Sequence, residues 1–304
     1  MDYSGTLRRG WEIAWQNKWL WLLALLPTLL GVINLFLAPL NEGLVVDPTV
    51  MTPEQASSFA GRAVLFSCLS LLVTLLVTFL GLITRGGMIT GVARLARGEA
   101  TGFGRSFNEG WRKVLPLLGM TILLYALPVI LFVAGTIAVW IPVAIGAMTS
   151  SLGQDGPLAG LEIVLICCLV VGFLVAMLFL GFIHPFAFRG IMLRRMGVVE
   201  SIRHGWRVLR ENVGQIILLA LPFVLAYVLF FAVFAAIYVL LLGLLWRGGI
   251  ENALLSGAIG ASDWRFLLVF LFYGLLGAVL STWQSATFTL GYLQWTGKDV
   301  LDVS

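Results

Sequence analysis

Few side chains in this sequence could do acid, base or nucleophilic chemistry. The two histidines are His184, in GFIHPFAFRG, and His204, in SIRHGWRVLR. Neither has a carboxylate pair, a nucleophile-bearing turn, zinc spacing or a phosphate-binding loop near it. Cys68, Cys167 and Cys168 fall in apolar stretches without metal or redox spacing, which predicts small packing residues. We therefore predict no catalytic residue, no metal site and no cofactor, and a protein that is not an enzyme.

His184 is the one histidine within an apolar stretch, where a charge costs at least about 2.5–3.5 kcal/mol. A proton relay or a ligand contact would explain it. Because Pro185 follows and frees backbone from its usual hydrogen bond, we favour a hydrogen bond from His184 to that backbone.

The elements that hold these residues are those of a membrane protein. Of 304 residues, 60% are hydrophobic and 11% charged, against about a quarter charged in soluble domains. A helix needs about 20 apolar residues to cross a bilayer core. Six stretches suffice, and none has an acidic or basic residue away from its ends: 19–39, 62–84, 114–148, 161–188, 215–246 and 266–290. We predict an all-α integral membrane protein with six transmembrane helices, forming one domain over residues 1–304.

Basic residues are distributed unevenly about these stretches. Sixteen of the 19 Lys and Arg fall on one side, leaving Arg62, Arg247 and Arg265 on the other. With the acidic residues included, the two sides carry about +8 and −4. Since flanking positive charge stays in the cytoplasm, we predict cytoplasmic termini. The positive total then reflects a polarised membrane protein and not a nucleic-acid binder.

Gly-Trp pairs precede three of the stretches, at Gly10-Trp11, Gly110-Trp111 and Gly205-Trp206. Each pair leads to a Leu-Pro, at Pro27, Pro128 and Pro222, which should bend the helices alike. The tryptophans lie 100 and 95 residues apart, and each interval holds two spans. We predict three parallel tandem repeats, at about 1–100, 101–198 and 199–304, each an amphipathic segment followed by two helices. The simplest arrangement is a pseudo-threefold one.

The segments around the Gly-Trp pairs have helical apolar faces, such as Ile202, Trp206, Leu209 and Val213. Ser106 and Glu109 also fit a capping box. We predict interfacial helices that anchor each repeat, with Trp at the headgroups and Arg near anionic lipid at about 1 kcal/mol each. A specific lipid or partner site is the alternative. The candidate contacts are Arg8, Arg9, Trp11, Trp111, Arg112, Arg203, Trp206, Arg207 and Arg210.

Small and hydroxyl residues recur at helical spacing along the second span of each repeat. In lipid such stripes let backbones approach closely, so we expect these three helices to pack centrally. The alternative is the wall of a polar path for a neutral or amphiphilic solute. The candidate contacts are Ser70, Thr74, Thr78, Gly172, Ala176, Gly277, Ser281 and Ser285.

The Gly-Trp junctions, the recurring Leu-Pro and the terminal ATFTLGYLQW resemble the membrane domain of bacterial glycerophosphodiester phosphodiesterases, and related stand-alone membrane proteins of unknown function. The resemblance covers most of the chain. It implies a six-helix domain of the bacterial inner membrane. That family's catalytic metal ligands lie in a soluble barrel, so no catalytic residue carries over.

Two functions from different classes fit these patterns. The first is a non-enzymatic membrane protein that organises membrane or partner proteins through a basic cytoplasmic face, with anionic lipids and a possible membrane protein as partners. The second is a passive transporter, flippase or channel for a lipid-like or neutral solute. An intramembrane enzyme is a third and less favoured reading.

Overall fold

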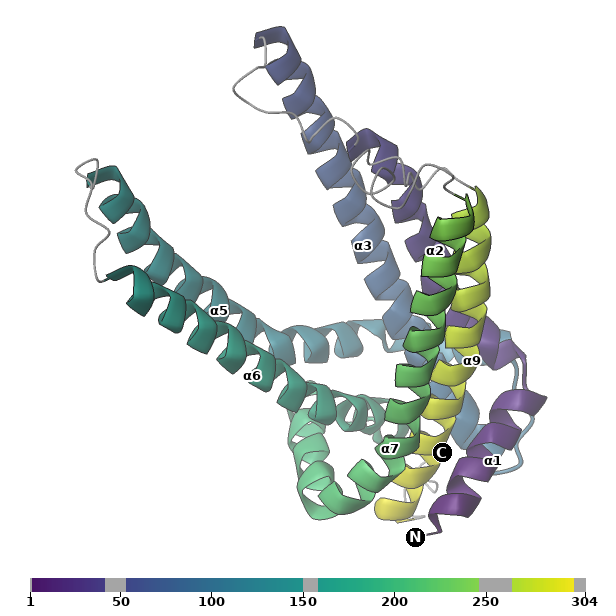
Figure 1. The fold of residues 1–304 in the computed structure, drawn as a ribbon. Helices are drawn as coiled ribbons and strands as arrows, with labels where there is room; N and C mark the ends of the chain where they lie inside the picture. The colour runs from purple at the N-terminus through teal and green to yellow at the C-terminus, as the bar shows by residue number, and fades with distance from the viewer. Residues whose placement is uncertain (1, 42–52, 150–157, 246–263, 298–304) are drawn as a thin grey trace. The chain divides into compact units, whose positions relative to one another are not determined.

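A computed structural model describes residues 2–41, 53–149, 158–245 and 264–297 (Figure 1). Every regular element in these ranges is a helix. They are α1 (Tyr3–Gln16), α2 (Trp19–Asn41), α3 (Pro53–Ala96), α4 (Phe103–Arg112), α5 (Val114–Thr149), α6 (Leu158–Arg194), α7 (Val198–Leu245) and α9 (Trp264–Trp295). The predicted outer loops and Lys298 lie outside the described residues.

Within the residues that the structure describes, four helices are long and apolar enough to cross a membrane: α3, α5, α6 and α7. A fifth span results if α1 and α2, which meet at 78°, count as one broken helix. The apolar side chains on these helices are largely exposed, as at Leu127, Leu178 and Leu225. An apolar surface of that extent, on helices long enough to span a bilayer, is typical of a membrane protein. The chain is an all-α protein of the multi-pass membrane class.

Asparagines break two of the amphipathic segments away from the spans that follow. Asn17 ends α1 and Asn212 is a non-helical residue inside α7. In both, the side-chain Nδ2 donates to the carbonyl four residues earlier, of Ile13 and of Val208, at 3.0 Å. The amide side chain thus gives a carbonyl next to the break a side-chain donor. At the third junction, Lys113 separates α4 from α5.

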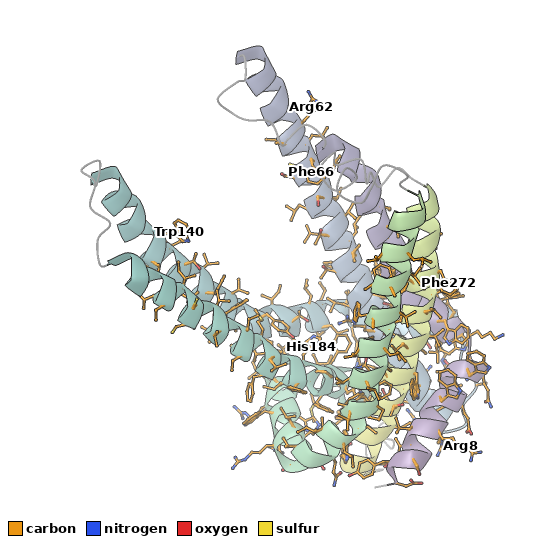
Figure 2. The ribbon with its side chains drawn as sticks, in the orientation of Figure 1. Arg8, Arg62, Phe66, Trp140, His184 and Phe272 are labelled. Carbon is orange, nitrogen blue, oxygen red and sulfur yellow. The ribbon has the colours of Figure 1, made fainter. Side chains whose placement is uncertain are left out.

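The structure divides into two compact units, and each is described by itself. The described residues of the first are 2–41, 53–114, 213–245 and 264–297. Its α9 packs against α1, α2 and α3, and α4 packs on α3. The apolar core joins four helices: Ile13, Leu20, Leu23, Met88, Val92, Ala286 and Leu290. Arg8 and Arg62 lie toward opposite ends of this unit (Figure 2).

The described residues of the second unit are 115–149 and 158–212, namely most of α5, α6 and the first part of α7. Phe132 on α5 and Phe173 on α6 have ring centroids 4.3 Å apart. The ring centroid of His184 lies 5.7 Å from that of Tyr125 and 5.6 Å from that of Phe188 (Figure 2). The imidazole of His184 therefore lies close to two aromatic rings, one on α5 and one on α6.

One predicted helix start differs in the structure. The capping box at Ser106 is wrong, because α4 begins three residues earlier with Gly102 as its N-cap. Ser106 is instead buried within α4, and Glu109 pairs with Arg94.

Candidate functional site

The glycines of the three Gly-Trp pairs each lie against the backbone of another helix. A Cβ on Gly110 would be 2.9 Å from the carbonyl carbon of Ile83 on α3, and one on Gly205 would be 2.7 Å from the nitrogen of Ala187 on α6. A Cβ on Gly10 would be 3.1 Å from the Cα of Thr287 on α9. Only a residue without a side chain permits helices to approach so closely.

A small hydroxyl residue precedes each of these glycines by four positions. Thr6, Ser106 and Ser201 are all buried. Residues four apart share one helix face, so each short helix packs through a pair of small residues. The sequence analysis missed this pattern, whose signal is Ser or Thr, three residues, then Gly-Trp.

The tryptophan after each glycine is partly exposed. Trp11 and Trp206 are 40% exposed and Trp111 is 58% exposed. Trp11 also meets Trp283 on α9, and Trp206 meets Phe179 on α6, with ring centroids 5.4 and 5.2 Å apart. Each segment thus packs through its small residues and leaves part of an indole ring exposed. Exposed indoles suit the headgroup region, where an apolar ring carries one polar N–H.

The predicted headgroup arginines have two kinds of surroundings. Arg8 pairs with Glu12 at 2.9 Å, and Arg9 Nη2 donates to the carbonyl of Ala96 at 3.0 Å. The other four are exposed and take part in no hydrogen bond or ion pair within the described ranges: Arg112, Arg203, Arg207 and Arg210. Their charges remain available to a ligand outside the chain.

Two basic residues counted as flanking charge have structural contacts instead. Arg189 is buried, and its Nη1 donates to the carbonyl of Pro185 at 2.9 Å. Arg94 on α3 pairs with Glu109 on α4 and lies 3.9 Å from Glu99. The ion pair between Arg94 and Glu109 ties α4 to the end of α3. A count of charges could not predict the contacts of Arg189 or Arg94, because the count ignores which helix face each residue occupies.

The predicted central contacts are only partly brought together. Thr74 and Thr78 are exposed, and their hydroxyls donate at 2.8 Å to the carbonyls of Ser70 and Thr74. Ser281 and Ser285 on α9 are half-buried, and a Cβ on Gly277 would lie 3.7 Å from Phe230 on α7. Within the first unit, α3 and α9 do pack together.

The remaining two predicted contacts lie on α6 in the second unit. Gly172 is exposed, with open space where a Cβ would stand, and Ala176 is half-buried. At Gly172 the small-residue stripe therefore makes no close helix contact with the described residues.

A polar contact that the sequence analysis missed lies inside the first unit. Tyr227 on α7 donates its hydroxyl hydrogen to Gln284 Oε1 on α9 at 3.0 Å. Nearby, the buried Thr282 hydroxyl donates to Ala278 at 2.7 Å. A glutamine in a membrane helix is itself a usable signal, because its amide needs partners there.

No family model, curated protein or solved structure matches this chain. The function proposed below rests on the residues of this chain. In the described ranges, no three His, Cys, Asp or Glu side chains gather as metal ligands would. What the three segments present is exposed indole beside exposed guanidinium, an arrangement suited to binding anionic groups at a membrane surface.

Proposed function

We propose that this protein is a non-enzymatic integral membrane protein that organises anionic lipids and partner proteins through the basic cytoplasmic face of its interfacial helices. The observation that carries the proposal is the group of exposed arginines without ion pairs in the described ranges: Arg112, Arg203, Arg207 and Arg210. They stand beside exposed Trp111 and Trp206. Juxtamembrane basic residues attract anionic lipid at about 1 kcal/mol each.

The architecture we propose for this function is six spans in three parallel repeats, similar to the membrane domain of the phosphodiesterases named above. Each amphipathic segment packs on the helix that ends a predicted repeat: α4 on α3, the first part of α7 on α6, and α1 on α9. The order of these contacts is cyclic, as repeats around one axis would require. On this proposal the chain sits in the bacterial inner membrane with cytoplasmic termini.

The decisive variant replaces Arg203, Arg207 and Arg210 with Glu. In nanodiscs of mixed phosphatidylcholine and phosphatidylglycerol, the wild-type protein should retain phosphatidylglycerol above the bulk ratio after mild extraction, by native mass spectrometry. The triple variant should retain the bulk ratio and lose any stoichiometric protein partner from native membranes. Arg62→Glu, an exposed arginine that the charge distribution predicts on the opposite side of the membrane, is the control. Unchanged enrichment in the triple variant would rule the proposal out.

Passive transport is the second candidate, favoured by the Tyr227–Gln284 contact inside the first unit. Hydroxyl and amide groups within a bundle could line a route for a neutral solute. Replacing Thr74, Thr78, Ser281 and Ser285 with Val or Leu should then stop flux into proteoliposomes without unfolding the protein. Intact flux would count against this function.

A further inference from the structure

A hollow of about 470 Å³ lies in the second unit, between α5, α6 and the first part of α7. Its wall is apolar along the spans, with Leu127 and Pro128 on α5 and Leu180 on α6. At the α7 side it is bordered by Arg203 and Trp206. The hollow is thus apolar along the spans, and at one edge it has the positively charged guanidinium of Arg203 and the indole of Trp206.

Arg203 gives this hollow its chemical selectivity. It is the one charged residue among those that line it, it is exposed, and it has no hydrogen bond or ion pair within the described ranges. Trp206 is held beside it by the ring of Phe179, with centroids 5.2 Å apart. A ligand that fits must have an apolar body and an anionic head.

The position of the hollow decides between a lipid and a peptide. Its apolar wall belongs to the membrane-spanning parts of α5 and α6. An inserted peptide would bring backbone N–H and C=O groups into an environment that cannot satisfy them, whereas an acyl chain brings none. The α5 wall, from Leu123 to Pro128, rises about 7.5 Å along the helix, so it covers the part of a chain nearest the headgroup.

We propose that this hollow is a binding site for an anionic phospholipid of the cytoplasmic leaflet. One acyl chain lies between α5 and α6, and the phosphate lies at Arg203. This inference deepens the proposed function and rests on it, because it gives one of the basic junctions a defined lipid ligand.

The test uses a phosphatidylglycerol with a photoactivatable acyl chain, in phosphatidylcholine nanodiscs that contain the full chain. After irradiation, mass spectrometry should find label on segments carrying Leu127 and Leu180, in excess over the exposed stretch 64–76 of α3. Unlabelled phosphatidylglycerol should compete and phosphatidylcholine should not. Arg203→Gln should weaken the competition about fivefold, as expected for one arginine at a lipid surface. Arg210→Gln, on the same helix but outside the hollow, should leave it unchanged.

A second variant fills the hollow without removing any packing. Val199 lines it and is 61% exposed, so Val199→Trp adds volume from an exposed position. Labelling of the two segments should then fall while the protein remains monodisperse. Equal competition by both lipids, or labelling that neither variant changes, would overturn the site. If the site fails while phosphatidylglycerol enrichment still depends on the arginines, the proposed function stands; if the enrichment also fails, both fall.

Discussion

Gly110 on α4 lies directly against Ile83 on α3, with no room for a Cβ between them. The neighbouring turn repeats the arrangement, because a Cβ on Gly87 would be 2.7 Å from the carbonyl oxygen of Ser106. Each helix therefore places a glycine against the backbone of the other where the two helices cross. Such a contact fixes the angle of the short helix, and with it the direction in which Trp111 points.

Gly110→Ala should lower the free energy of unfolding by about 1–3 kcal/mol, since the added methyl group forces the helices apart. Gly104→Ala is the matched control on the same helix, where a Cβ meets open space. Thermal unfolding in detergent, followed by circular dichroism, measures both. Equal melting temperatures for the two variants would mean that the close contact does not exist.

Glu109→Gln should loosen α4 from α3. It removes the charge that pairs with Arg94, whose side chain is only 19% exposed. A hydrogen bond to a charged group contributes about 1.5–3 kcal/mol, and partial exposure places the expected loss toward the lower end. Glu12→Gln, which loses an exposed pair with Arg8, should change unfolding by less than about 0.5 kcal/mol. A larger loss in the control would contradict the assignment.

The sequence could predict the helices and the Gly-Trp junctions, but not which side of each amphipathic segment packs against protein. Periodicity assigns Trp11 and Ala14 to one apolar face, yet Ala14 is buried and Trp11 is 40% exposed. A helix at a membrane surface meets protein on one side and lipid on another. Both accept apolar residues, so hydrophobicity cannot separate them, whereas residue size can.

The same ambiguity limits the reading of charges and hydroxyls. Arg189 and Arg203 look alike as flanking charges, but one is buried against Pro185 and the other is exposed. Thr74 and Thr78 look like helix contacts, but their hydroxyls bond their own helix. In a membrane helix a threonine can satisfy itself locally, so its presence in a stripe does not identify a partner.

Asn17 is expected to stabilise the break between α1 and α2. Its side chain and its backbone N–H both donate to the carbonyl of Ile13, at 3.0 and 3.2 Å. Asn17→Ala should lower the free energy of unfolding by about 1 kcal/mol through the lost hydrogen bond. Gln16→Ala, an exposed neighbour, should change it little. Hydrogen exchange at the end of α1 gives a local readout, and equal exchange in the two variants would refute this role.

The proposed cytoplasmic location of the basic face can be tested with single cysteines at Arg8 and Arg62, which lie toward opposite ends of the first unit (Figure 2). The native Cys68, Cys167 and Cys168 are exposed, so replacing them with Ala removes little packing and gives a suitable background. In intact cells whose outer membrane has been permeabilised, an impermeant maleimide should label Arg62→Cys, because the sparsely charged side faces outward. Arg8→Cys should react only after the inner membrane is opened. Early labelling of Arg8→Cys would invert the topology and remove the arginines from the anionic cytoplasmic leaflet on which the lipid site depends.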